Sequence, residues 1–219
     1  MKAREILEAV CESLKAEYNA HTILLYGSMA DGSANADSDI DIAAFGPVHQ
    51  ITRIAKIQDG MFIDAFIYPE AVLKDPEDGH LRFRGSEILL QKAGSAEALL
   101  QRLDEKYEAG PKALPADEIQ VRKTWARKMV ARIKRGDAEG NYRRNWLLTA
   151  LLEDYFHLRG LWFEGPKKAL AWLNVHDSAT LEAMEAALQP GAPIKAIEVA
   201  VAHVLNEHVP NQGGSSGFN

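Results

Sequence analysis

The stretch that decides the fold is GSMADGSANADSDID, residues 27–41. It opens with a Gly-Ser step and ends in three acidic residues within five positions, which are Asp37, Asp39 and Asp41. A solvated acidic loop would explain this charge, and so would a pair of carboxylates that holds metal ions. The segments on either side decide between these two interpretations.

The last two aspartates belong to SDIDIAAF, residues 38–45, in which acidic and apolar side chains alternate. A period of two is typical of a β-strand with one polar face. On such a strand Asp39 and Asp41 leave the same face. Like charges at that range raise a pKa or require a cation, and Mg²⁺ takes oxygen ligands and shares its shell with substrate phosphates. The pattern therefore predicts a metal site beside a nucleotide.

A third carboxylate lies downstream in FIDAFIY, residues 62–68, another β-rich segment. Asp64 is the one acidic residue of this otherwise apolar segment. If the segment pairs beside 38–45, Asp64 reaches the same cluster, and three carboxylates on neighbouring strands suit a two-metal phosphoryl-transfer site. On an unpaired surface strand, Asp64 would be an ordinary exposed charge.

The Gly-Ser step follows HTILLYG, residues 21–27, which also reads as a strand. Gly27 lets the backbone approach a ligand closely, and the amides after it form a concavity that binds anions. The hydroxyl of Ser28 adds a donor for a phosphate oxygen, and Ser38 is a further candidate. A phosphate-binding turn and metal carboxylates are thus predicted on adjacent strands.

The pattern along the chain predicts two parts. Residues 1–96 form an α/β unit, with a helix over 2–18 and strands at 21–27, 38–45, 62–68 and near 87–91. Residues 97–209 are almost wholly helical, and residues 210–219 form a Gly/Ser-rich tail expected to be disordered. The expected helices cover 117–135, 141–159, 166–174, 178–188 and 192–208.

The composition is that of a soluble globular protein of 219 residues, with 47% hydrophobic residues and a net charge of −6. No apolar run approaches the length of a membrane span, and the N-terminus lacks a signal-peptide pattern, so we expect a cytoplasmic protein without a membrane partner. The net charge argues against broad nucleic-acid binding. The acidic excess lies in residues 1–96, because residues 97–219 carry equal numbers of acidic and basic side chains.

The stretch GSMADGSANADSDIDI resembles the signature of the DNA polymerase β-like nucleotidyltransferase superfamily. That signature is an apolar residue, Gly-Ser, a spacer and then Asp-apolar-Asp-apolar, and Asp64 matches the third carboxylate of the family. The resemblance implies a polymerase β-like palm, with Asp39, Asp41 and Asp64 as catalytic residues and ligands of two Mg²⁺ ions. It also implies that Gly27 and Ser28 bind the triphosphate of an NTP, expected to be ATP.

The helical half resembles, less closely, the C-terminal helical domain of aminoglycoside nucleotidyltransferases. The segment that carries this resemblance is RRNWLLTALLEDYFHLRGLWFEGPKKALAWL, residues 143–173. In those enzymes the helical domain closes the cleft, and Lys167 matches the lysine that contacts the triphosphate. The implied fold is an α/β palm followed by a C-terminal helical bundle, with residues 1–96 as the nucleotidyltransferase domain.

The implied reaction is transfer of a nucleoside monophosphate to a hydroxyl of a small-molecule acceptor such as an aminoglycoside, with release of pyrophosphate. Two alternatives stay open. A toxin-like enzyme would modify tRNA or protein, so that tRNA is the one nucleic acid expected as a partner. A degenerate module would bind a nucleotide without catalysis.

Four charged residues of the helical half are further candidates. Arg143 and Arg144 open the helix expected over 141–159 and are placed to contact substrate. Glu153 and Asp154 on the same helix would suit a cationic acceptor or replace Asp64 as the third carboxylate. For each, an ordinary charge at the surface or between helices is the alternative.

Overall fold

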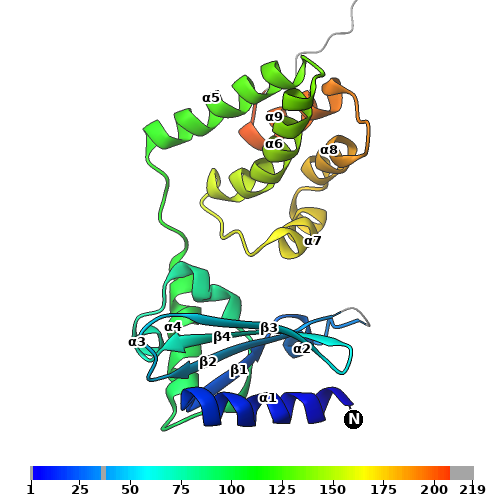
Figure 1. Cartoon of the computed structure of the whole chain (residues 1–219). Helices are drawn as coiled ribbons and strands as arrows, with labels where there is room; N and C mark the ends of the chain where they lie inside the picture. The colour runs from blue at the N-terminus through cyan, green and yellow to red at the C-terminus, as the bar shows by residue number, and fades with distance from the viewer. Residues whose placement is uncertain (1, 36–37, 208–219) are drawn as a thin grey trace, which may run out of the picture. The chain divides into compact units, whose positions relative to one another are not determined.

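The computed structural model describes residues 2–35 and 38–207, and the chain divides into two compact units, Met1–Ala109 and Gly110–Asn219 (Figure 1). The sequence pattern placed the boundary at 96/97. It falls later because the helix α4 (Ser95–Ala109) packs on the sheet unit through Ala96, Leu99 and Leu103, which are fully buried. The predicted tail, 210–219, lies outside the described residues.

The first unit is a five-stranded mixed sheet with one helix before the first strand, one after the last, and short helices between strands (Figure 1). Its strands are β1 (Thr22–Tyr26), β2 (Ile40–Gly46), β3 (Thr52–Gln58), β4 (Met61–Pro69) and β5 (Glu87–Leu90). Its helices besides α4 are α1 (Lys2–Tyr18), α2 (Ser28–Asp31), α3 (Ala71–Lys74) and the 3₁₀ helix η1 (Asp78–Phe83). The strands lie in the order β3-β4-β2-β1-β5, with β2 and β4 parallel and the other neighbours antiparallel.

The two faces of the central strand β2 meet different parts of the unit. Ile40, Ile42 and Ala44 point into one core cluster, where they pack with Ile6 and Val10 of α1. The other face carries the residues between them, which begin with Asp41. That face is aromatic at its far end, where Phe45 of β2 stacks on Tyr68 of β4 at 5.6 Å between ring centroids. The alternation of SDIDIAAF is thus a division between an apolar face and a face that starts with a carboxylate.

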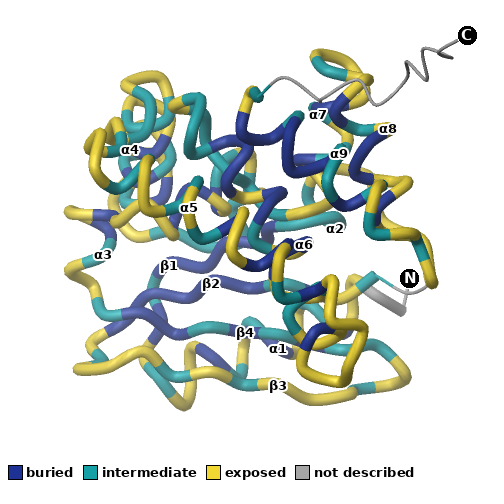
Figure 2. The backbone as a smooth tube through the Cα atoms, turned by 90° about the horizontal axis from the view of Figure 1, so that it is seen from above, coloured by how far each residue is buried: buried dark blue, intermediate teal, exposed yellow. Residues whose placement is uncertain are grey.

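The strand β3 is absent from the sequence prediction. It lies at the edge of the sheet, and most of its side chains are half-buried or exposed, with Ile57 75% exposed (Figure 2). Its segment, TRIAKIQ, therefore lacks the apolar face that marked the other strands. It joins β4 through Asp59 and Gly60, both with positive φ, in a two-residue hairpin turn.

The second unit is helical over its described residues, 110–207. Its elements are α5 (Ala116–Ile133), α6 (Ala138–His157), α7 (Pro166–His176), α8 (Ser178–Leu188) and α9 (Ile194–Leu205). They lie close to the helices expected from the 3.6-residue period. Leu147 and Leu151 of α6, Leu173 of α7 and Ala200 of α9 are fully buried in one shared core. Among residues 2–35 and 38–207, no helix combines the length and the apolar character that a membrane crossing needs.

Candidate functional site

Two of the predicted carboxylates lie side by side in the sheet. Asp41 of β2 is in register with Asp64 of β4, its parallel neighbour, and with Tyr26 of β1 on the other side. Residues in register on neighbouring strands point to the same face and lie about 5 Å apart. The strand order, which the sequence does not contain, thus places Asp64 beside Asp41.

The surroundings of the Asp41 carboxyl group disfavour its negative charge and raise its pKa. Half-burial is the largest cause that raises its pKa, and the charges of Asp39 and Asp64 raise it further. The guanidinium of Arg82 lowers it in part. A carboxylate that is desolvated between two like charges favours a proton or a bound cation.

Gly27 is fitted against this carboxylate. Its backbone has φ 73° and ψ −156°, a region open essentially to glycine. A β-carbon at this position would lie 2.5 Å from Oδ2 of Asp41, closer than any non-bonded contact allows. Glycine is therefore required here both by the turn after β1 and by the space that the Asp41 carboxylate occupies.

Asp64 is held by an arginine that the sequence analysis did not consider. Nε of Arg53 donates to Oδ1 of Asp64 at 2.7 Å, and Nη2 donates to Oδ2 at 2.9 Å. Arg53 lies on β3, which pairs with β4 so that Ala55 faces Asp64 and Arg53 faces Phe66. The arginine side chain crosses Phe66, with its guanidinium carbon 5.1 Å from the ring centroid, and ends on the carboxylate.

A second arginine lies on the same side of the sheet. The guanidinium of Arg82, from η1, lies 5.1 Å from the ring centroid of Phe66 and 5.7 Å from that of Tyr26. It donates a short hydrogen bond to the hydroxyl of Tyr68. Its positive charge also lowers the pKa of Asp41. Arg82 thus offsets part of the negative charge of the carboxylate row, which consists of Asp39, Asp41 and Asp64.

Both arginines were missed for identifiable reasons. Arg53 belongs to the edge strand whose pattern is weak, and Arg82 belongs to a 3₁₀ turn with no motif. The Asp59-Gly60 turn was the available signal for Arg53. A two-residue hairpin turn requires a strand before it as well as after it, and that strand places Arg53 diagonally across from Asp64.

The remaining predicted site residues of the first unit are Asp39, Ser28 and Ser38. Asp39 is exposed and precedes β2, which begins at Ile40, so it is not within the strand as expected. Ser28 is the first residue of α2, directly after Gly27. The Oγ of Ser38 accepts a hydrogen bond from the backbone N–H of Asn35 at 2.8 Å.

The donor chemistry of the row suits a hard divalent cation, because Asp41 and Asp64 offer carboxylate oxygens in register and Asp39 adds charge nearby. Across residues 2–35 and 38–207, however, no three His, Cys, Asp or Glu side chains gather closely enough to hold a metal ion. Both oxygens of Asp64 are bound to Arg53 instead. The carboxylates thus suit a metal ion in their chemistry and in their register, and one of them, Asp64, is bound by the guanidinium of Arg53.

The candidates from the helical half fall in the second unit. Lys167 is exposed in the first turn of α7. Arg143 pairs with Glu139 on its own helix at 2.6 Å. Asp154 is buried, with Oδ1 2.7 Å from Nη1 of Arg122, so it serves an ion pair between α5 and α6.

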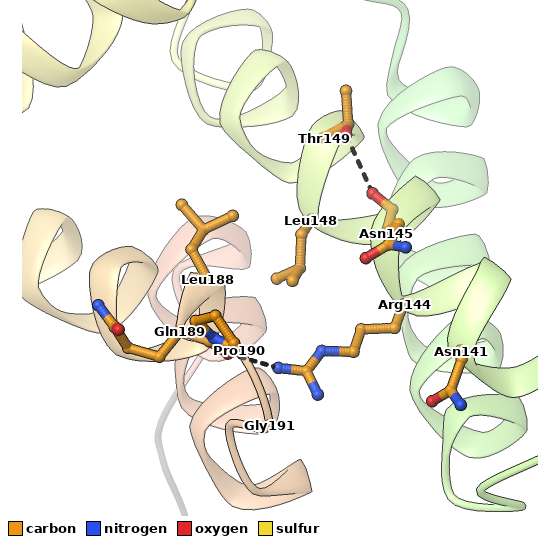
Figure 3. A pocket seen from close by; sticks show the side chains of 9 residues that line it. All are labelled: Asn141, Arg144, Asn145, Leu148, Thr149, Leu188, Gln189, Pro190 and Gly191. Atoms are coloured by element: carbon orange, nitrogen blue, oxygen red, sulfur yellow. Dashed lines mark hydrogen bonds between the residues drawn. The ribbon is translucent and has the colours of Figure 1, made fainter.

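Arg144 lines a pocket of about 450 Å³ between α6 and the α8–α9 connection (Figure 3). The pocket is lined by Asn141, Arg144, Asn145, Leu148, Thr149, Leu188, Gln189, Pro190 and Gly191. The Arg144 guanidinium donates to the backbone carbonyls of Ala187, Gln189 and Ala192 at 3.1–3.2 Å. Its charge therefore ties α6 to the chain between α8 and α9, and the pocket lacks the carboxylates that mark the first unit's site.

Residues 3–105 match the family model of the nucleotidyltransferase domain. The first unit carries a nucleotidyltransferase domain. The chain is accordingly a transferase of the kind that moves nucleotidyl groups, and such domains use a nucleoside triphosphate and a divalent metal ion. Among solved structures, a nucleotidyltransferase-like protein from Exiguobacterium sibiricum is similar, with a TM-score of 0.44 and 12% identity, covering 90% of this chain and 71% of that one. No curated protein matches the chain.

Proposed function

We propose that the protein transfers a nucleoside monophosphate from an NTP, expected to be ATP, to a hydroxyl of a small-molecule acceptor, with release of pyrophosphate. The observation that carries this proposal is the register of Asp41 with Asp64 across two parallel strands, beside the Gly27-Ser28 turn. This arrangement places acidic oxygens next to a backbone turn on one face of a nucleotidyltransferase domain.

In the proposed site, Asp39, Asp41 and Asp64 would hold two Mg²⁺ ions. When bound, such ions neutralise charge on the triphosphate and lower the pKa of the attacking hydroxyl. The chemistry of the three carboxylates supports this role, and so does the raised pKa of Asp41, because a cation relieves the like-charge repulsion that raises it.

The chain's own residues would do the rest. The backbone at Gly27 and the hydroxyls of Ser28 and Ser38 contact the triphosphate, which fixes its α-phosphorus near the carboxylates. A carboxylate oxygen of Asp64 accepts the proton of the acceptor hydroxyl as the new phosphorus–oxygen bond forms. The bond from the α-phosphorus to the bridging oxygen breaks at the same time, and pyrophosphate leaves with that electron pair.

The helical unit is the proposed source of the remaining contacts, with Lys167 as a ligand of the triphosphate. An aminoglycoside is the proposed class of acceptor. The acidic excess of the first unit supports a cationic acceptor, since a field of one sign raises the local concentration of the opposite charge. The resemblance of residues 143–173 to aminoglycoside nucleotidyltransferases supports the same class.

The test is a label-transfer assay with ATP that carries the label on the α-phosphate, Mg²⁺, and three acceptor pools in parallel: aminoglycosides, total tRNA and protein extract. We expect label in the aminoglycoside pool together with one pyrophosphate per transfer. Label in RNA or protein would instead support the toxin-like alternative. Nucleotide binding without transfer to any pool would contradict catalysis and support the non-catalytic module.

A matched pair of variants ties the transfer to the site. Asp41→Asn should lower turnover by about 10²–10³-fold or more, because a charge that acts at the reacting phosphate is lost. Asp59→Asn removes the same charge in the β3–β4 turn, where asparagine tolerates the positive φ, and should leave turnover unchanged. Equal activity of the two variants would contradict the assignment of Asp41.

A further inference from the structure

We propose that Arg53 is a displaceable counter-cation of the metal site, which competes with a divalent cation for Asp64 and releases the carboxylate when the cation binds. Arg53 would then set the affinity of the site for metal. This inference rests on the proposed function, in which Asp64 is a metal ligand.

The geometry makes the two cations competitors for Asp64. Arg53 contacts both carboxylate oxygens, one with Nε at 2.7 Å and the other with Nη2 at 2.9 Å. A two-pronged guanidinium takes one lone pair of each carboxylate oxygen and offsets the negative charge of the group, so it competes with a metal ion for Asp64. A metal ion that Asp64 shares with Asp41 therefore binds more strongly once Arg53 has released one or both of its oxygens.

The two partners differ in how far they are free to move. Asp64 lies on β4, between β2 and β3, and its side chain is 16% exposed. Arg53 lies on the edge strand β3, and its side chain is 56% exposed. The arginine can therefore turn into water, whereas the carboxylate stays in register with Asp41, where a bound cation replaces the lost positive charge.

The ring of Phe66 gives the arginine a surface along which to move. Its centroid is 5.1 Å from the guanidinium carbon of Arg53, on the strand position that Arg53 faces. A cation over an aromatic face keeps part of its stabilisation after it loses a carboxylate. The released arginine would thus stay near the site, on the ring.

A surface ion pair that only fastens the edge strand is the simpler interpretation of the same bonds. That interpretation gives Arg53 an effect on stability and no effect on metal binding. The two are separated by a direct measurement of metal affinity, without nucleotide or turnover.

The experiment is titration of the full chain with Mn²⁺, with free Mn²⁺ followed by electron paramagnetic resonance. Four variants are compared with the wild type: Arg53→Gln, Arg53→Lys, Lys56→Gln and Asp41→Asn. Lys56 is the matched control, because it carries the same charge on the same strand but alternates to the opposite face from Arg53. Circular dichroism checks that each variant is folded.

We expect Arg53→Gln to lower the Kd for Mn²⁺ about 3- to 10-fold, the effect of freeing a carboxylate from a partly exposed ion pair. Arg53→Lys should fall between this variant and the wild type, because a lysine keeps the charge but loses the fork. Lys56→Gln should match the wild type. A Kd for Arg53→Gln that equals that of Lys56→Gln, or exceeds it, would overturn the proposal.

The Asp41→Asn variant separates this failure from a failure of the proposed function. If the wild type binds Mn²⁺, Asp41→Asn does not, and Arg53→Gln changes nothing, the metal site stands and Arg53 has no part in it. If the wild type and Asp41→Asn bind Mn²⁺ alike, the carboxylate row is not the metal site, and both proposals fall.

Discussion

Two arginine–aspartate pairs, one in each unit, have the same contact distance and different surroundings. In the sheet unit Arg53 approaches Asp64 to 2.7 Å, and in the helical unit Arg122 approaches Asp154 to 2.7 Å. The aspartate at the sheet has a second carboxylate, Asp41, in register beside it. The aspartate on α6 instead shares its arginine with Glu118 of α5.

The burial of the two pairs differs as well. The Asp154 side chain is 8% exposed, and that of Arg122 is 27% exposed. Arg122 also donates to Glu118 at 2.8 Å and lies 3.2 Å from Nδ1 of His157. Removing one partner from a buried network of this kind leaves a charge without water or a counter-ion, which is costly. The half-exposed Arg53 can be solvated by water when it loses its partner. The two pairs therefore differ in the exposure of the arginine and in the second carboxylate beside Asp64, and not in the N–O distance. These two features distinguish a structural ion pair from one that we propose to be displaceable.

The largest expected effect is on turnover in Asp64→Asn. The amide keeps the shape and one oxygen but loses the negative charge and the basicity, so turnover should fall by about 10²–10⁴-fold. Asp39 and Asp41 would still hold the nucleotide-bound metal, so NTP affinity measured by calorimetry should change little. Normal turnover in this variant would contradict the assignment of Asp64 as the third carboxylate, which would then have to be another residue.

The matching change in the helical unit should act on stability instead. Asp154→Asn leaves Arg122 without its buried partner, and we expect a loss of about 3 kcal/mol in the free energy of unfolding. Glu153→Gln, an exposed neighbour on the same helix, is the control and should cost under about 1 kcal/mol. Because all four tryptophans lie in this unit, their fluorescence during denaturant unfolding reports on it alone. A similar loss in both variants would contradict the structural role of Asp154.

Two glycines sharpen the assignment of the site. Gly27→Ala should cost about 1–3 kcal/mol of stability from its backbone conformation, and its methyl group should displace the Asp41 carboxylate and weaken Mn²⁺ binding. Gly32→Ala also carries a positive φ, but a β-carbon there meets no atom within 4 Å. It should lose about 1 kcal/mol and keep the metal affinity of the wild type. Equal metal affinities in the two variants would remove Gly27 from the site.

The smallest expected effect is a pH dependence of the metal-free protein. The pKa of Asp41 is raised on folding, so folding favours its protonated form, and stability is lost as the pH rises above about 3.9, the ordinary value, through the raised pKa. The difference in thermal midpoint between Asp41→Asn and the wild type should therefore grow in favour of the variant from pH 4 upward. Saturating Mg²⁺ should shrink that difference. A difference in thermal midpoint that stays constant with pH would show that folding does not raise the pKa of Asp41.

The sequence was sufficient for the parts of the site that obey short-range rules. The alternation of Asp41 with Ile40 and Ile42 predicted a strand with one apolar face, and the structure confirms that face in the core against α1. Gly27 was predicted to let the backbone approach a ligand, which stays a prediction. The structure shows a different requirement for glycine, because a β-carbon at this position would meet Oδ2 of Asp41.

The missing parts depend on long-range arrangement. The pairing of β2 with β4 skips β3, which folds back onto the outer side of β4, and no local pattern encodes that order. Arg53 became visible only with that edge strand. Arg82 comes from the 3₁₀ helix η1, which is distant from Asp41 in the sequence. It lies near the carboxylates because its guanidinium packs on the rings of Tyr26 and Phe66. Strand order and the reach of long side chains are set by packing, which the periodicity of a sequence does not report.

The most direct test of the account is a crystal structure of the full chain with Mn²⁺, with the ion located by its anomalous scattering. We predict a peak bound by carboxylate oxygens of both Asp41 and Asp64, at about 2.1–2.2 Å, with the guanidinium of Arg53 moved off at least one oxygen of Asp64. A peak at another place, or an Asp64 that is still held by both arginine nitrogens while Mn²⁺ is bound at Asp41, would contradict it.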